Sequence, residues 1–421
     1  MLEDEARLDS IALHVLPAVG YVNLKPMEEP SSQPPSVSAL VAKDIAIEGM
    51  VLLKNEGPLL PLPGTARLAV VDAGNLRAVL VVGGAASVSL PGSGKPRPSS
   101  PALTTRSTLW STSRLGKRSR YGWSTARALP SRSPEPLSSP SGTWLAPARG
   151  PVRTNGSACG RLRCALVLAG RLTGESMDAD GLTLPGTQGG LISAVAAANP
   201  RTIVVTMGAG PVVMPWLPDV PAIIHAWFPG EQFGPALADV LTGRAEPVGR
   251  LPITFPTDEA TTSIQRPQQY PGVNGVATCS EELLLGYRWY QDRGVEPAYP
   301  FGHGLGYTTF DFDHLRAELT EAGIGLTFIV RNIGSRPGKA VPQIYVSYPS
   351  DAGEPPAQLK ALEVVHLQPA EALQVEIGIP LDDLAIFDEL SGSRVVRPGA
   401  YAIHLGVSSA ELLLKAEVQI G

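Results

Sequence analysis

Two kinds of segment alternate between residues 37 and 241. Short, almost wholly apolar runs predict buried strands, and runs of roughly ten residues with mixed polarity predict helices. The apolar runs are 50–62, Arg67–Asp72, Cys164–Gly170, Thr202–Thr206 and Ala222–Trp227, and the helical runs are Val41–Gly49, Thr187–Ala198 and Gly234–Leu241. Buried strands that alternate with helices are typical of a mostly parallel sheet covered on both faces. We therefore expect an α/β sandwich from about residue 36 to about residue 310.

The pattern changes after Phe310 to short strands separated by turn residues. The expected strands are Leu326–Arg331, Val341–Ser347, Leu359–Leu367, Leu373–Ile379 and Ala400–Gly406. Their spacing of roughly ten residues, with Gly and Pro in the turns, is typical of a β-sandwich. The sequence therefore predicts an all-β sandwich over residues 320–421.

The first 25 residues predict one amphipathic helix. Pro17 and Gly20 end it, and a Pro/Ser-rich linker follows at 26–38. Its apolar stripe consists of Leu2, Ala6, Leu8, Ile11, Ala12, Val15 and Leu16.

Residues 90–163 break the pattern, because no period of two or 3.6 residues continues through them. Ser, Pro and Arg make up about half of this segment, and Glu135 is its only acidic residue. Three interpretations stay open: a solvated, disordered insertion, a pair of reading-frame shifts, and a basic tract that binds nucleic acid. The frameshift is favoured by the family resemblance given below, which stops abruptly near Ser87 and resumes abruptly near Cys164.

Composition and charge exclude several classes of function. The net charge of −5 gives no electrostatic footprint for nucleic acid, and the scattered Cys159, Cys164 and Cys279 form no disulfide or zinc pattern. The acidic N-terminus has no basic region followed by an apolar one, and no apolar run approaches the ~20 residues of a membrane span. We expect a cytoplasmic protein that binds neither membrane nor nucleic acid, unless an upstream export signal has been lost.

Three motifs rich in glycine, proline and aromatic residues follow one another: Trp227–Gly234, Gly249–Pro256 and Glu296–Phe310. The last, Glu-Pro-Ala-Tyr-Pro-Phe-Gly-His-Gly-Leu-Gly-Tyr-Thr-Thr-Phe, predicts a sharply bent loop with buried aromatic side chains. In this order the motifs resemble the second domain of family 3 glycoside hydrolases, the β-glucosidase and β-xylosidase group. Gln343-Ile-Tyr345 and Leu359-Lys-Ala-Leu362 resemble the fibronectin type III-like domain that follows it in many members.

The resemblance gives each expected domain an identity. Residues 36–310 are then the family's C-terminal α/β sandwich, with 90–163 as an insertion, and 320–421 the fibronectin type III-like domain. Residues 1–25 correspond to the last helix of a preceding (β/α)₈ barrel that this chain lacks.

The same resemblance implies a reaction and its catalytic groups. Retaining hydrolysis of a terminal β-D-glucosyl or xylosyl residue takes two carboxyl groups about 5–5.5 Å apart and, in this family, no cofactor. Aligning Leu182-Thr-Leu-Pro-Gly-Thr-Gln188 with the family pattern places Glu175 at the acid/base position and Asp178 at the pattern's substrate-binding Asp. Ser176 replaces the pattern's Gly and Ala179 its Arg. The nucleophile is absent, because no Ser-Asp-Trp motif occurs in the chain.

Other candidate residues are expected to have structural rather than catalytic roles. His225 lies on an apolar strand and is expected to be a core histidine, while Lys54-Asn55 and His303 are expected to be structural. No cluster of His, Cys or acids has the spacing of metal ligands, so we expect no metal site.

Two functions from different classes remain. In the first, the chain belongs to a β-glucosidase-type hydrolase whose substrate is a β-glucoside or oligosaccharide, and the chain is inactive in isolation. In the second, it is a non-catalytic carbohydrate-binding or structural remnant. A third interpretation is that the carboxylates of the loop containing Glu175 are exposed to solvent and have no catalytic role, as most surface acids do not. Loss of the barrel would also leave an apolar surface, so self-association through the barrel-facing surface is expected.

Overall fold

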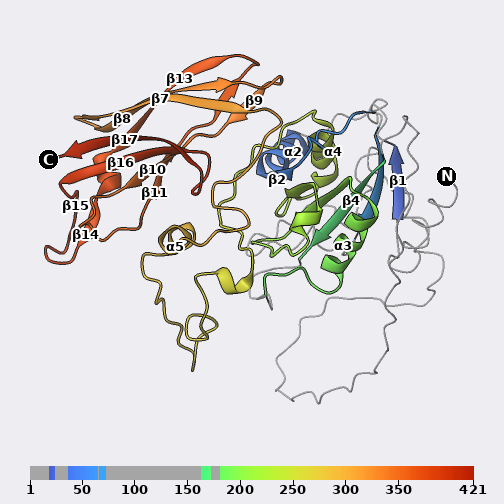
Figure 1. Cartoon of the computed structure of the whole chain (residues 1–421), viewed down its shortest axis with the longest axis horizontal. Helices are drawn as coiled ribbons and strands as arrows, with labels where there is room; N and C mark the ends of the chain where they lie inside the picture. Colours follow the sequence, from blue (N-terminus) through green and yellow to red (C-terminus); the bar gives the residue numbers. More distant parts are fainter. Residues whose placement is uncertain (1–18, 24–36, 65, 73–162, 172–180) are drawn as a thin grey trace. The chain divides into compact units, whose positions relative to one another are not determined.

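The computed structural model describes residues 19–23, 37–64, 66–72, 163–171 and 181–421. Its first part contains a six-stranded sheet in the order β1-β3-β4-β5-β6-β2 (Figure 1). The strands are β1 (Val19–Asn23), β2 (Val51–Asn55), β3 (Arg67–Asp72), β4 (Arg163–Gly170), β5 (Thr202–Met207) and β6 (Ala222–His225). Strands β3 to β6 pair in parallel, whereas the edge strands β1 and β2 pair antiparallel with β3 and β6.

Helices cover both faces of this sheet (Figure 1). Helices α2 (Val37–Gly49) and α4 (Phe233–Thr242) pack on one face, and α3 (Gln188–Ala198) packs on the other. Side chains alternate along a strand, so Ile203 and Val205 of β5 belong to the core under α2 and α4, whereas Val204 belongs to the core under α3. Every residue of β5 is buried, which confirms the prediction of a sheet covered on both sides.

An irregular stretch connects the sheet to the second part of the chain. It contains the 3₁₀ turn η5 (Glu259–Thr261) and helix α5 (Tyr287–Arg293). The predicted loop from Glu296 then returns to the sheet, because Leu305 N donates to Leu52 O (2.9 Å) and Tyr299 forms a β-bridge with Phe255. The loop therefore closes over edge strand β2.

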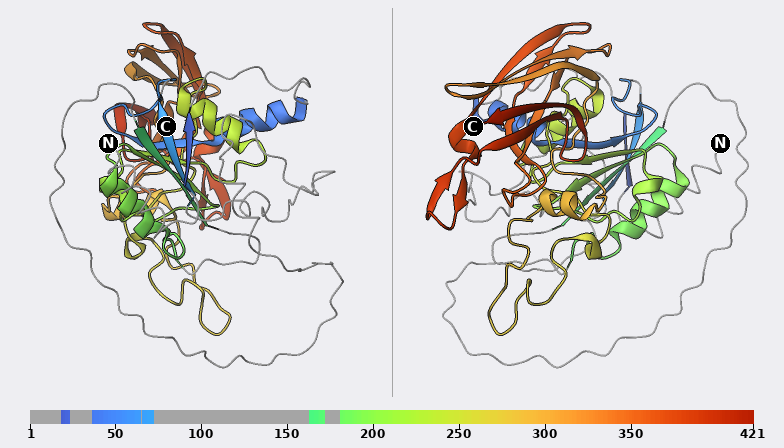
Figure 2. Two further views of the ribbon diagram at one scale, coloured as in Figure 1. Left: turned by 90° about the vertical axis from the view of Figure 1, so that its right-hand side faces the viewer. Right: turned by 60° about the vertical axis from the view of Figure 1, so that its left-hand side comes forward.

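The second part is all-β. Its two main sheets have the orders β11-β10-β16-β17 and β13-β8-β7, and they enclose one apolar core (Figure 2). The strands are β7 (Phe310–Thr320), β8 (Gly323–Asn332), β9 (Gly338–Ala340), β10 (Gln343–Ser347), β11 (Gln358–Leu362), β12 (Val365–Leu367), β13 (Ala372–Pro380), β14 (Ile386–Asp388), β15 (Ser393–Val395), β16 (Gly399–Gly406) and β17 (Leu412–Ile420). A short 3₁₀ turn, η6 (Leu381–Leu384), follows β13. The predicted fold class, an α/β sandwich followed by an all-β sandwich, is confirmed.

Several element predictions need correction. Val19–Asn23 was expected within an N-terminal helix but forms strand β1, because pairing with β3 satisfies its backbone at the sheet edge. Leu359–Leu367 was expected as one strand, but β11 and β12 belong to different sheets and separate at Glu363–Val364. The rest of the predicted N-terminal helix and the whole segment 90–162 lie outside the described residues.

Candidate functional site

The candidate site lies at the carboxyl edge of the parallel strands. Strands β4, β5 and β6 end there at Gly170, Met207 and His225, and open α/β sheets bind ligands at this edge. The loop that leaves β4 spans 172–180 and contains Glu175 and Asp178, both of which lie outside the described residues. The structure does describe the residues that enter and leave this loop.

Gln188 fixes the end of β4. Its Oε1 accepts a hydrogen bond from Gly170 N and its Nε2 donates to Gly170 O, each at 2.8 Å. One side-chain amide thus satisfies both backbone groups of the last residue before the loop. Gln188 is buried and is the first residue of α3, so the end of β4 is tied to the start of that helix.

Arg171, the next residue, reaches across to the other end of the loop. Its Nη2 donates to Leu182 O (2.6 Å), and more weakly to Thr183 O (3.3 Å) and Pro211 O (3.4 Å). Its Nε is buried and has no hydrogen-bond partner within the described part of the chain. Burial lowers the pKa of Arg171, and the charge of Glu259 opposes that shift.

Glu259 completes the fixation of the loop exit. Its Oε1 accepts a hydrogen bond from Leu182 N (2.5 Å), while Val213 N donates to Leu182 O (2.9 Å). A Cβ on Gly181 would lie 2.6 Å from the same carboxylate oxygen, so a side chain there would displace the Glu259 carboxylate from its present position. Glu259 is held in turn by its place in η5, which has Asp258 as its N-cap.

His225 is buried beneath this edge with no exposed surface. Its Nδ1 shares a hydrogen bond with Thr206 Oγ1 (2.9 Å), and its ring meets Trp227 and Phe255 edge-on, with centroids 4.3 and 5.2 Å away. Its Nε2 has no hydrogen-bond partner among the residues described. Burial lowers the pKa of His225 to about 3, so the ring is neutral. It is a core histidine, as expected, with one nitrogen satisfied.

The backbone around Trp227 is unusual. Trp227 adopts a φ of 52°, which is rare for a bulky residue, and its carbonyl accepts a hydrogen bond from Gly208 N (3.2 Å). Its side chain packs against the core under α3. Strained backbone of this kind gathers at ligand-binding edges.

The remaining candidates have structural roles. Lys54 Nζ donates to Leu217 O (2.9 Å), and the side chain of Asn55 bonds both backbone groups of Leu60. The Nε2 of His303 lies 2.9 Å from Leu53 O, and its ring stacks on Tyr299. These contacts confirm the structural expectation for each of them.

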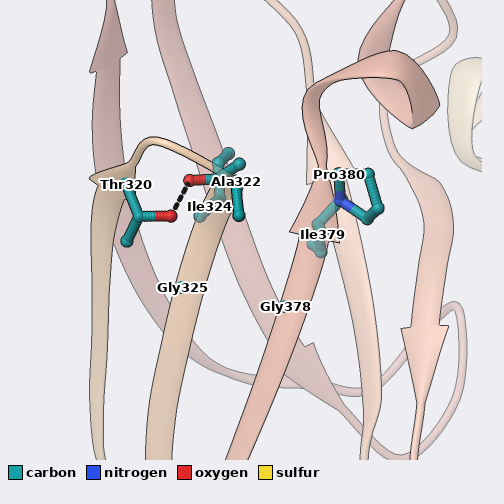
Figure 3. Close-up of a pocket in the computed structure, with 8 residues that line it drawn as sticks. Thr320, Ala322, Ile324, Gly325, Gly378, Ile379 and Pro380 are labelled. Atoms are coloured by element: carbon teal, nitrogen blue, oxygen red, sulfur yellow. Dashed lines mark hydrogen bonds between the residues drawn. The ribbon is translucent and has the colours of Figure 1, made fainter.

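Within residues 19–23, 37–64, 66–72, 163–171 and 181–421, no group of three His, Cys, Asp or Glu side chains could hold a metal ion, and no helix could span a membrane. A hollow at the β7–β8 turn is lined by Thr320, Ala322, Gly323, Ile324, Gly325, Gly378, Ile379 and Pro380 (Figure 3). None of these side chains is ionisable, and Thr320 Oγ1 donates to Gly323 O (2.9 Å), so the hollow offers no acid or base.

The sequence pattern missed Arg171 and Glu259. Arg171 precedes the motif used for alignment, and Glu259 lies 77 residues from Leu182 along the chain. No local spacing links residues so far apart, so only the fold shows that they meet.

Comparison with known proteins identifies the domains. Residues 50–307 match the family model "Glycosyl hydrolase family 3 C-terminal domain", and 340–409 match "Fibronectin type III-like domain". A β-glucosidase of Rhizobium radiobacter is 38% identical over 253 residues, which cover 58% of this chain and 31% of that protein. Thermostable beta-glucosidase B of Acetivibrio thermocellus is 33% identical over 264 residues, covering 61% and 35%.

Solved structures agree. DesR, a β-glucosidase from Streptomyces venezuelae crystallised with D-glucose, aligns with a TM-score of 0.60 at 36% identity and covers 61% of this chain and 34% of DesR. A family 3 β-glucosidase of Bifidobacterium adolescentis covers 93% of this chain with a TM-score of 0.66, and at 23% identity it supports the fold alone. The chain spans about a third of the length of the curated relatives that it matches. Because the first family model matches well over half of the chain, the chain belongs to glycosyl hydrolase family 3.

Proposed function

We propose that this chain supplies the acid/base half of a retaining β-glucosidase, with Glu175 as the proton donor and acceptor. The observation that carries the proposal is the fixed base of the loop containing Glu175. Gln188 holds its entry and Glu259 its exit, at the sheet edge where α/β domains bind ligands. Family membership supplies the reaction class, and the relatives bear the name β-glucosidase.

The chemistry assigned to Glu175 has two steps. A carboxylate nucleophile attacks the anomeric carbon while Glu175 donates its proton to the leaving oxygen. Glu175 then takes a proton from the water that hydrolyses the glycosyl-enzyme intermediate. No Ser-Asp-Trp motif occurs in these 421 residues, so the nucleophile comes from outside them. The substrate class is a terminal β-D-glucosyl or xylosyl residue, and Asp178 contributes to its binding.

An aryl β-glucoside assay tests this proposal. The chain alone should show no measurable hydrolysis, because the covalent route is missing. It is then mixed with the separately produced part of the Rhizobium radiobacter β-glucosidase that has no counterpart here. Turnover that appears only in the mixture, and that falls in Glu175→Gln, supports the assignment. Turnover by the chain alone that is equal in Glu175→Gln would exclude it.

A non-catalytic, carbohydrate-binding role is the second candidate. Ser176 and Ala179 favour it, because they replace the Gly and Arg of the family's acid/base pattern. Titration calorimetry of the chain with glucose separates the two functions: heat of binding together with an inactive mixture would support the binding role alone.

We also propose that the chain self-associates through apolar side chains left exposed on α2. Val37, Val41 and Ile45 are spaced by four residues, so they share one face of the helix, and their exposed fractions are 78%, 51% and 67%. A contiguous apolar stripe of this kind marks an interaction surface more often than a free one. The partner that we propose is the same apolar face of α2 on a second copy of the chain, because two apolar faces bury each other from water.

A further inference from the structure

Residues 262–286, which we call the arm, connect η5 to α5 without a helix or strand of their own, and they extend below α5 in Figure 1. The side chain of Gln269 holds the arm together. Its Oε1 accepts hydrogen bonds from Gln265 N (3.0 Å) and Arg266 N (3.1 Å), and its Nε2 donates to Glu281 Oε2 (2.9 Å). Because Glu281 lies 12 residues further along the chain, this last bond joins the two sides of the arm. The arm is therefore a closed loop rather than an extended linker.

The tip of the arm is a two-residue hairpin. Val273 and Val276 exchange both backbone hydrogen bonds, at 2.9 and 3.1 Å. Asn274 and Gly275 between them adopt positive φ angles of 53° and 76°, as a type I′ turn requires. A Cβ on Gly272 would lie 2.6 Å from Val276 O, so the chain approaches itself closely there. The tip therefore has a defined conformation that can present side chains to a partner.

The arm bonds its polar groups to one another and exposes its apolar side chains. Six large apolar side chains are 46–64% exposed: Ile264, Tyr270, Val273, Val276, Leu283 and Leu285. The charged residues of the arm are Arg266, Glu281 and Glu282. Covering this surface removes much apolar area and few charges from water, which favours association. Within the described residues, no other segment of this length exposes as many large apolar side chains, and such patches mark interaction sites.

The arm starts at the carboxyl edge of the sheet. It leaves η5 directly after Thr261, and η5 is bonded to that edge, because Glu259 Oε1 accepts a hydrogen bond from Leu182 N. Phe228 follows the end of β6 at His225 on the same edge, and it is also exposed. The exposed apolar surface therefore begins beside the edge at which the proposed reaction takes place.

We propose that the arm is the docking surface for the polypeptide that carries the nucleophile. This inference rests on the proposed function, in which a second carboxyl group from outside this chain comes within about 5–5.5 Å of the acid/base group. A polypeptide that brings it there must cover the carboxyl edge, from which the arm extends. Its source is the part of each relative without a counterpart here, since this chain covers 31% and 35% of the two curated relatives named above.

A second copy of this chain is the competing occupant of the arm. It would bring no Ser-Asp-Trp motif to the carboxyl edge, so it does not explain why the apolar surface starts there. The stripe proposed for contact between copies lies on α2, and none of its residues belongs to the arm. The polypeptide with the nucleophile is therefore the occupant that we assign.

Hydroxyl-radical footprinting of the full chain locates the contact. The probe is the separately produced part of the Rhizobium radiobacter β-glucosidase that has no counterpart here. It should slow the oxidation of Leu283 and Leu285 by about fivefold, because a docked surface excludes water. Leu362 and Leu373, on β11 and β13, are the matched control, since they are 52% and 48% exposed against 51% and 52% for the arm pair. Their oxidation should not change.

Two footprinting results would overturn the proposal. The first is protection of the control pair without protection of the arm pair. The second is protection of the arm that appears when the concentration of this chain alone is raised, because the occupant would then be a second copy.

The same two pairs of leucines give matched variants for an affinity measurement. Leu283→Lys/Leu285→Lys should weaken binding of the Rhizobium radiobacter portion by about tenfold or more, because the lysine charges lose water on docking. Leu362→Lys/Leu373→Lys should leave the dissociation constant within about twofold of the parent value. Both variants should keep the thermal midpoint of the parent, because all four side chains are already half exposed. Equal affinities of the two variants would contradict the assigned surface.

Hydrolysis in the mixture separates docking from chemistry. The arm variant should need about tenfold more of the portion for half-maximal turnover of an aryl β-glucoside, with the plateau within about twofold of the parent. A parent that binds through the arm without hydrolysis would refute the proposed function and leave the docking surface standing. A parent that binds neither this portion nor the corresponding part of the Acetivibrio thermocellus enzyme would overturn the docking surface.

Discussion

At the scale of single residues, burial decides what the ionisable groups near the sheet edge can do. His225 has one hydrogen-bond partner, two aromatic neighbours and no exposed surface, so its neutral form is strongly favoured. A neutral, inaccessible imidazole cannot serve as the proton donor of a glycosidase. His225 therefore does not compete for the acid/base role that we propose for Glu175.

His225 should make the protein sensitive to acid. Its folded pKa is about 3 against an ordinary 6.5, so below pH 6.5 the unfolded chain takes up a proton that the folded chain refuses. The contribution is complete above pH 6.5 and is lost toward pH 3, by about 1.4 kcal/mol per pH unit. Urea titrations between pH 7 and 4 should show a shallower decline in His225→Gln than in the parent. Parallel declines would contradict the account.

At the scale of elements, the glycines of the family motifs permit backbones to touch. A Cβ on Gly249 would lie 2.6 Å from Met50 O, and one on Gly304 would clash with Gly249 O. The main chains of three segments therefore pack directly against one another: strand β2, residues 249–256 and the loop from Glu296.

Gly304→Ala should accordingly lower the free energy of unfolding by roughly 1–3 kcal/mol, because the backbone that it meets cannot move aside cheaply. Gly210→Ala is the matched control, since nothing lies within 4 Å of its added Cβ. Denaturant midpoints measure both. A Gly304→Ala protein as stable as the control variant would show that this close approach is relaxed in solution.

Gln188 offers a second test at this scale. Gln188→Leu removes both partners of the Gly170 backbone, which stays buried, and should cost about 2–4 kcal/mol. Gln374→Leu, at an exposed site where the amide bonds only Glu376, should cost less than about 0.5 kcal/mol. Similar unfolding midpoints for the two variants would refute the role given to Gln188.

Sequence patterns predict elements well where burial is complete and poorly where it is partial. The apolar runs of β3 to β6 predict buried strands. Strands β7 and β17 were not predicted, because apolar and charged side chains are mixed along them. Strand β1 was taken for a helix, because its pairing with β3 depends on a partner 44 or more residues away. The same holds for the candidate site: a local motif predicts Glu175, which lies outside the described residues, whereas the hydrogen bonds of Leu182 with Arg171 and Glu259 depend on the fold.

At the scale of the whole molecule, the apolar stripe on α2 should govern the behaviour of the chain in solution. Sedimentation velocity should show association that is weakened in Val41→Glu/Ile45→Glu, since charge on the shared face opposes contact between copies. Leu390→Glu is the control, because Leu390 is 97% exposed in the turn between β14 and β15. A monomeric parent, or equal loss in both variants, would exclude the α2 face.

The dependence of the rate on the leaving group tests whether Glu175 acts as the general acid and base, as we propose. In the mixture with the Rhizobium radiobacter portion, Glu175→Gln should lower kcat/KM on methyl β-glucoside by about 10²–10⁴-fold, because the poor leaving group needs the proton. The first step with 2,4-dinitrophenyl β-glucoside should be almost unaffected, and added azide should restore turnover by giving glucosyl azide. Equal losses on both substrates without azide rescue, or no loss on either, would contradict the assignment.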